Sequence, residues 1–135
     1  MANLRIIRLR GVTTKDVAAL KAQSVTNADH LLSRGRTPKG RRELAAATGL
    51  SEAAILELVN RADLARVKGV GRQFSNLLEN AGVDTVRELA QRKPEHLHAT
   101  LVEHAVASEV KRAPSLKEVE SWVTQAKSLP RMVEY

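Results

Sequence analysis

Apolar residues recur every three or four positions along most of the chain, which is the spacing of helices that bury one face. Three of these stripes are Ala54, Ile55, Leu58 and Val59; Phe74, Leu77, Leu78 and Ala81; and Leu116, Val119, Trp122, Val123 and Ala126. No segment alternates convincingly between apolar and polar residues. Leu4 to Leu9 is the one candidate strand, and its pattern is mixed. The pattern therefore predicts an all-helical protein with Phe74 and Trp122 in its core.

Residues that cap helices stand at the starts of the expected helices, and they support this prediction. The expected caps are Thr13 with Asp16, Thr26 with Asp29, Thr37 followed by Pro38, Asp84 before a helix over Thr85 to Gln91, and Ser115 with Glu118. Three of these pairs have the spacing of a capping box: Thr13 with Asp16, Thr26 with Asp29, and Ser115 with Glu118.

The chain also repeats itself weakly when it is compared with itself at an offset of 58 residues. The matching pairs include Leu20 with Leu78, Val25 with Val83, Leu31 with Leu89 and Arg34 with Arg92. Each copy is expected to contain a glycine turn, a helix, a short helix, a proline and a longer helix. We therefore predict an N-terminal basic module over residues 1–60 and a C-terminal module over residues 61–135, packed through one continuous core.

Charge is distributed unevenly between these halves. Lys and Arg number 22 against 15 Asp and Glu, a net charge of +7, and all of this excess lies in the first 50 residues. Such asymmetry favours a polyanionic partner, nucleic acid first, although it also serves solubility. The chain has no cysteine, which excludes disulfides, thiolate zinc sites and a cysteine nucleophile. It has no apolar run that could span a membrane, and we expect a soluble, cytoplasmic protein without a membrane partner.

The sharpest local motif is the turn Gly69-Val70-Gly71 between two apolar helices. The glycines allow a tight turn and a close approach, and the amides that begin the next helix can hold a phosphate. Lys68 and Arg72 flank the turn and can add positive charge. The alternative is a turn that serves geometry alone. Gly11-Val12-Thr13 is a weaker version, in which Thr13 replaces the second glycine.

A basic loop offers a second phosphate contact. It contains Arg34, Arg36, Lys39, Arg41 and Arg42 within nine residues that include no acid. Contacts of Lys and Arg side chains to the phosphate backbone of a nucleic acid are independent of base sequence and sensitive to salt. Because no aromatic residue is nearby to stack on single-stranded bases, duplex DNA fits better. The alternative is a solvated linker between modules.

The turn with its flanking helices resembles the helix-hairpin-helix motif of proteins that bind DNA without sequence specificity. The segments 60–71, 81–92 and 114–130 together resemble a bacterial family of stand-alone proteins of unknown function with tandem helix-hairpin-helix modules. Residues 82–97 are also similar to part of the C-terminal domain of the bacterial RNA polymerase α subunit, which binds DNA through related hairpins. The resemblance implies an all-α fold, with two tandem helix-hairpin-helix-like modules packed into one compact domain. It implies no reaction.

An enzyme is not expected, because no nucleotide-binding loop, zinc-protease signature or nucleophile motif appears in the chain. Glu95 and His98 share a helical face, and His104 follows, but the second metal-binding pair of a bundle site is missing. We therefore expect no metal and no cofactor. Two functions remain: sequence-independent binding of the duplex DNA backbone without catalysis, and a protein–protein adaptor that uses the same modules.

Overall fold

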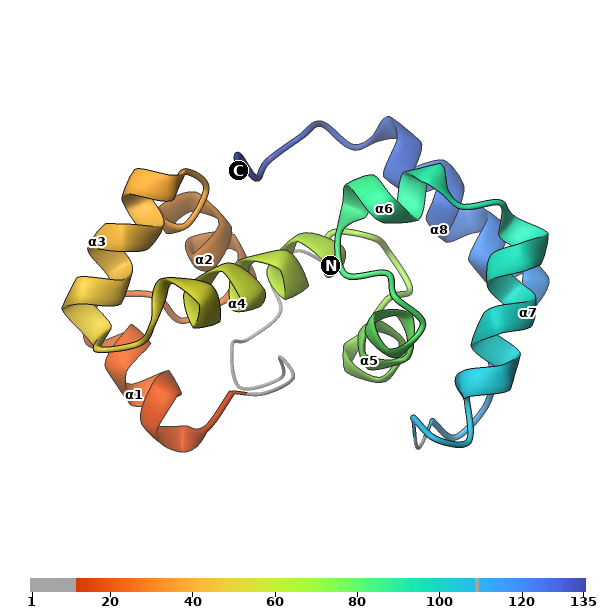
Figure 1. Cartoon of the computed structure of the whole chain (residues 1–135), viewed down its shortest axis with the longest axis horizontal. Helices are drawn as coiled ribbons and strands as arrows, with labels where there is room; N and C mark the ends of the chain where they lie inside the picture. Colours follow the sequence, from red (N-terminus) through yellow and green to blue (C-terminus); the bar gives the residue numbers. More distant parts are fainter. Residues whose placement is uncertain (1–11, 109) are drawn as a thin grey trace. The chain divides into compact units, whose positions relative to one another are not determined.

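The computed structural model describes residues 12–108 and 110–135, apart from the side chain of Arg72. Within this part of the chain all regular structure is helical (Figure 1), and the predicted all-α fold is confirmed. The helices are α1 (Thr14–Lys21), α2 (Ala28–Arg34), α3 (Pro38–Thr48), α4 (Glu52–Leu64), α5 (Arg72–Asn80), α6 (Val86–Gln91), α7 (Pro94–His104) and α8 (Leu116–Ser128). None of these helices has the length and apolar character that crossing a membrane requires.

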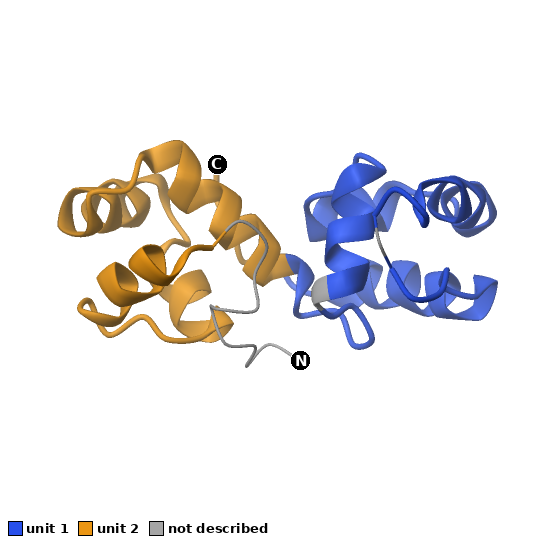
Figure 2. Ribbon diagram, turned by 90° about the horizontal axis from the view of Figure 1, so that it is seen from below, with its two compact units in different colours: residues 1, 64–130 blue, residues 2–63, 131–135 orange. Residues whose placement is uncertain are grey.

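The described residues form two compact units (Figure 2). Unit 1 comprises residues 64–130, and unit 2 comprises residues 12–63 together with the C-terminal tail 131–135. The division falls at the end of α4, a few residues after the sequence-based boundary at residue 60. The tail, which the sequence analysis assigned to the C-terminal module, belongs to unit 2.

The two units contain the same series of four helices. Helices α1 to α4 have 8, 7, 11 and 13 residues, and α5 to α8 have 9, 6, 11 and 13. Helices α1 and α5 begin 58 residues apart, as do α2 and α6, which is the offset of the sequence repeat. The repeat is therefore present in the structure as a four-helix unit.

The turn between the first two helices is repeated in backbone detail. The Val25 N–H donates to the Leu20 carbonyl at 2.9 Å, and the Val83 N–H donates to the Leu78 carbonyl at 2.8 Å. The residue before each valine is left-handed: Ser24 has φ 63° and Gly82 has φ 91°. A left-handed residue lets the chain reverse and bury the following valine, and glycine adopts this conformation without steric cost.

Two of the three predicted capping boxes are present, at Thr13 with Asp16 and at Ser115 with Glu118, and the one predicted at Thr26 with Asp29 is not. The predictions of Thr26 and Asp84 as caps are wrong by one residue. Asn27 caps α2 by accepting from the His30 N–H at 2.9 Å, and Thr85 caps α6 by accepting from the Glu88 N–H at 3.0 Å. The shift follows from packing, because starting each helix one residue later buries its first residue, Ala28 or Val86.

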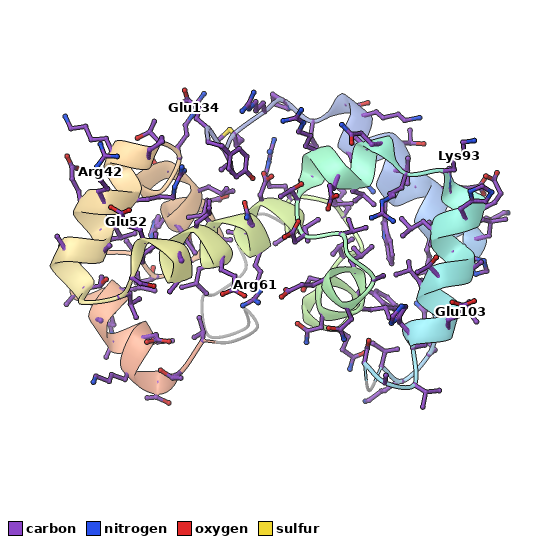
Figure 3. The ribbon with its side chains drawn as sticks, in the orientation of Figure 1. Arg42, Glu52, Arg61, Lys93, Glu103 and Glu134 are labelled. Atoms are coloured by element: carbon purple, nitrogen blue, oxygen red, sulfur yellow. The ribbon has the colours of Figure 1, made fainter. Side chains whose placement is uncertain are left out.

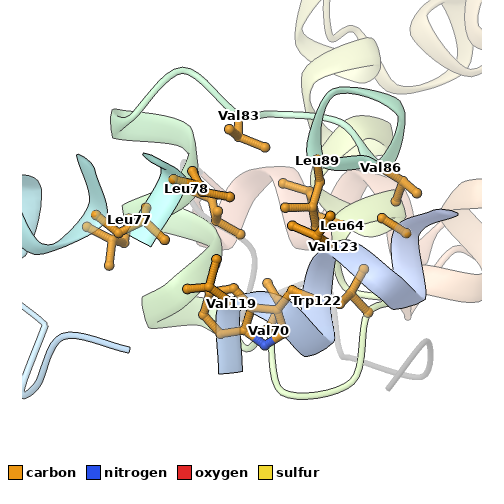
Figure 4. Close-up of a cluster of buried hydrophobic side chains, with 14 residues drawn as sticks. Leu64, Val70, Leu77, Leu78, Val83, Val86, Leu89, Val119, Trp122 and Val123 are labelled. Carbon is orange, nitrogen blue, oxygen red and sulfur yellow. The ribbon is translucent and has the colours of Figure 1, made fainter. Parts of the chain in front are cut away.

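Buried hydrophobic side chains form two clusters, one in each unit, whereas the sequence analysis expected one continuous core. The unit 2 cluster consists mainly of Leu, Val, Ile and Ala, and Val133 of the tail belongs to it. The unit 1 cluster is built around Trp122, which is 1% exposed (Figure 4). Phe74 is partly buried beside it, with the two ring centroids 5.2 Å apart. The core position predicted for Trp122 is confirmed, and Phe74, which is partly exposed, packs against that core.

Candidate nucleic-acid interface

The glycine turn of unit 1 joins the end of α4 to α5. Val70 is buried in the core, and Figure 4 shows its side chain beside Trp122. Gly69 has φ +93°, and a Cβ on it would lie 3.0 Å from Trp122 Nε1. Gly69 is therefore required both by its left-handed backbone and by the indole beneath it. These two residues set the geometry of the turn.

Gly71 has a different role, because neither its backbone nor its packing requires glycine. It is the N-cap of α5 with φ −94° and ψ −163°, and a Cβ on it would meet no atom within 4 Å. No side chain caps α5, and its first turn contains no acidic residue. The positive end of the α5 dipole thus meets open space at an exposed glycine.

The start of α5 differs from the other helix starts in the described part of the chain. Six helices have a side-chain oxygen that accepts from their first turn: α1, α2, α3, α4, α6 and α8. Helix α7 has no such cap, but Pro94 removes an N–H there and Glu95 adds negative charge to the first turn. Among these helix starts, α5 is therefore the one best suited to bind an anion.

The backbone before the turn is held by a side chain that the sequence analysis missed. Gln125 Oε1 accepts from the Lys68 N–H at 2.8 Å, and Gln125 Nε2 donates to the Lys68 carbonyl at 3.1 Å. Gln125 Nε2 also donates to Ser121 Oγ at 3.1 Å. Gln125 thus fixes the turn, while the side chain of Lys68 remains exposed to solvent. The predicted contribution of the Arg72 side chain lies outside the described residues.

The cations of the basic loop, in unit 2, differ in burial and in the contacts that they make. Arg41 is only 6% exposed, so its prediction as a phosphate ligand is wrong. Its Nη1 donates to the carbonyls of Gly35 and Arg36 at 2.9 and 3.1 Å, and its Nη2 donates to the carbonyl of Glu134 at 2.7 Å. Its guanidinium also lies 6.0 Å from the ring centroid of Tyr135. Arg41 therefore joins the loop to the C-terminal tail.

Arg34 also makes a backbone contact, because its Nη1 donates to the Gln23 carbonyl at 2.7 Å. In the repeat, Arg92 makes a similar but longer contact, from Nη2 to the carbonyl of Gly82, one residue beyond the counterpart of Gln23, at 3.5 Å. Both arginines thus reach back to the turn between the first two helices of their unit. Arg34 remains exposed, but part of its hydrogen-bonding capacity is used within the fold.

The three other cations of the loop face solvent. Arg42 is exposed and lies on α3 (Figure 3). Lys39 Nζ lies 4.0 Å from a carboxylate oxygen of Glu43, and Arg36 Nε lies 3.7 Å from Oε2 of Glu134. Exposed pairs of this kind are weak and exchange readily with other anions. Arg36, Lys39 and Arg42 are therefore the loop cations most available to a phosphate, while the exposed Arg34 already donates to the Gln23 carbonyl.

The N-terminal turn does not fit the predicted phosphate site. Thr13 Oγ1 accepts from the Asp16 N–H at 3.1 Å, and the Thr13 N–H donates to Asp16 Oδ2 at 3.2 Å. Because a carboxylate already occupies the start of α1, a phosphate there would be repelled, and the prediction for Thr13 is wrong. The corresponding prediction for Gly11 lies outside the described residues.

The histidines and acids of the described residues include no group of three that could hold a metal ion. His96 is exposed, and His98 and His104 are partly buried.

These features define an all-helical protein made of a repeated four-helix unit, with an uncapped helix start in unit 1 and a basic loop in unit 2. The chain matches the family described as a domain of unknown function, DUF4332, over residues 10–129, and it belongs to that family. Neither a curated protein nor a solved structure matches the chain.

Proposed function

We propose that the protein binds the phosphate backbone of duplex DNA without sequence preference and without catalysing a reaction. The observation that carries the proposal is the start of α5, where Gly71 leaves an uncapped helix end open to an anion. Backbone N–H groups and the helix dipole both favour a phosphate at such a position. The exposed Lys68 precedes this turn and adds positive charge.

Unit 2 supplies a second contact in this proposal. Arg36, Lys39 and Arg42 are exposed, and lysine and arginine contacts to phosphates carry no base information. The net charge of +7 attracts a polyanion over distances of about 10 Å at 0.1 M salt. Each unit is proposed to contact the DNA backbone with its own residues.

The resemblance noted in the sequence supports the same function. We propose that the turn Gly69-Val70-Gly71, which precedes α5, is the hairpin of a helix-hairpin-helix-like module, and that the repeated unit is of this type. In the non-sequence-specific DNA-binding proteins whose helix-hairpin-helix motif the turn resembles, the hairpin amides hold a phosphate of the DNA backbone. We also propose that the protein acts in the cytoplasm of a bacterium, where the DNA lies.

A salt titration of binding to labelled random-sequence duplex DNA tests the proposal. We expect a dissociation constant of roughly 10⁻⁴ to 10⁻⁶ M near physiological salt, independent of sequence. Four phosphate contacts, from Lys68, Arg36, Lys39 and Arg42, give a log–log salt slope of about −3 to −4. Absence of binding at about 50 mM salt, where backbone contacts are strong, contradicts the proposal.

Exposed valines favour a second candidate, the protein–protein adaptor. Val106 is 90% exposed and Val102 is 47% exposed, at and just after the C-terminal end of α7. Exposed apolar side chains that join into a patch mark protein-binding surfaces, and these two valines are four residues apart in the chain. If the chain does not bind DNA at low salt, this surface becomes the better candidate for function.

A further inference from the structure

The C-terminal tail is anchored to unit 2 along its length. Val133 is 2% exposed and belongs to the hydrophobic cluster of that unit. The Glu134 N–H donates to the Arg36 carbonyl at 2.8 Å, and the Glu134 carbonyl accepts from Arg41 Nη2 at 2.7 Å. Tyr135 OH donates to Asn60 Oδ1 at 2.7 Å. The position of the tail is thus set by contacts that do not involve the carboxylate of Glu134.

That carboxylate is held beside the basic loop as a consequence. Glu134 Oε2 lies 3.7 Å from Arg36 Nε, and the two side chains are 56% and 50% exposed. Figure 3 shows Glu134 and Arg42 labelled on unit 2. Arg36 is one of the three loop cations most available to a phosphate, so a bound phosphate and Glu134 require the same guanidinium.

We propose that Glu134 is a built-in competitor of the DNA backbone, which lowers the affinity of the basic loop for phosphate. This inference rests on the proposed function. When a phosphate takes Arg36, the carboxylate of Glu134 loses its partner and is left near a second negative charge. Val133 and Tyr135 anchor the backbone on both sides of Glu134, so a movement of this backbone cannot take the carboxylate away from Arg36.

The expected size of the effect follows from the exposure of the pair. An exposed ion pair changes affinity by about two- to fivefold. The competition also changes the salt dependence, because an Arg36 that is released from Glu134 neutralises one more DNA phosphate and releases its counterion. Removing the carboxylate should therefore make the log–log salt slope steeper by about one unit.

The test compares Glu134→Gln with Glu52→Gln and with the unmodified full chain. Glutamine keeps the size of the side chain, and the N–H and carbonyl contacts of residue 134 remain. Glu52 is an exposed acid of the same unit, in the first turn of α4. In the described part of the chain Glu52 forms no ion pair with a cation of the basic loop, whereas Glu134 pairs with Arg36.

We expect Glu134→Gln to bind random duplex DNA about two- to fivefold more tightly than Glu52→Gln, with the steeper slope, while their melting temperatures agree. Equal or weaker binding by Glu134→Gln overturns the inference and leaves DNA binding intact. Tighter binding with an unchanged slope overturns the competition for Arg36. If neither the unmodified chain nor a variant binds, the proposed function falls and the inference falls with it.

Discussion

The indole of Trp122 lies directly against Gly69, so that a Cβ on this glycine would come within 3.0 Å of Trp122 Nε1. The buried core of unit 1 and the exposed turn are therefore in contact at these two residues. Gln125, on the same helix as Trp122, holds the adjacent Lys68 backbone through two hydrogen bonds. Helix α8 thus supports the turn through both residues, Trp122 against Gly69 and Gln125 on the Lys68 backbone.

Replacing Gly69 with alanine is expected to lower the free energy of unfolding by about 2 kcal/mol, because its left-handed backbone and the nearby indole both oppose a Cβ. Urea denaturation measures the change. Gly71→Ser is the matched control, because Gly71 has negative φ and open space around it, and serine is a good N-cap. An equal loss in the two variants would contradict the distinction drawn between the glycines.

A carboxylate introduced at the start of α5 should weaken DNA binding without lowering the stability of the fold. Gly71→Asp and Gly71→Asn both introduce an N-cap, and each should leave stability unchanged or raise it by a few tenths of a kcal/mol. Aspartate also places a negative charge where the phosphate is proposed to bind, which at about 4 Å in water costs about 1 kcal/mol. We expect Gly71→Asp to bind DNA about fivefold more weakly than Gly71→Asn in an anisotropy titration. Equal affinities would show that no phosphate binds at this helix start.

Neighbouring arginines of the basic loop should behave in opposite ways. Arg41→Ala removes a buried guanidinium from three backbone carbonyls, and we expect a loss of about 2 to 4 kcal/mol in the free energy of unfolding. Arg42→Ala should change stability by less than about 0.5 kcal/mol, because the side chain is exposed. It should instead make the salt slope of DNA binding shallower by about one unit. The reverse pattern in denaturation and binding would contradict the assignment of roles.

Lowering the pH should reduce the stability of unit 1, because it protonates Glu118. Hydrogen bonds from Arg112, at 2.6 and 3.0 Å, are the main cause that lowers the pKa of Glu118 from 4.5 to about 2, and the Ser115 N–H adds to the effect. Because the folded pKa is the lower one, this stabilisation is fully present above pH 4.5 and is lost as the pH falls toward 2.

The matched variant for this prediction is Glu118→Gln, which keeps a capping-box residue but cannot ionise. At pH 7 we expect it to be less stable than the unmodified chain by about 1 kcal/mol, a value reduced for solvent screening. The difference in melting temperature should shrink as the pH falls from about 4.5 toward 2. A difference that stays constant over this range would show that the Glu118 charge does not stabilise the fold.

Helix positions could largely be predicted from the sequence, because the signals for them are local. Ser115 and Glu118 are three residues apart, and their hydrogen bonds form within a single turn. Where two capping residues stand side by side, as at Thr26 and Asn27, the local signal is ambiguous. Burial of Ala28 then decides which residue caps the helix. The repeat was also visible, because the left-handed turn and the buried valine after it recur at a constant offset.

The roles of the charged and polar residues depended on contacts between distant parts of the chain. The basic loop reads as a uniform run of cations, but Arg41 is buried because the Glu134 carbonyl, 93 residues away, accepts one of its hydrogen bonds. Gln125 lies 57 residues from Lys68, and nothing in its own surroundings in the sequence indicates that it holds the turn. The sequence by itself determined the helical class, the repeat and the glycine turn, since periodicity, capping and backbone freedom act over a few residues. Only the tertiary structure decided which cations remain exposed, because a guanidinium is buried only where folding brings enough acceptors around it.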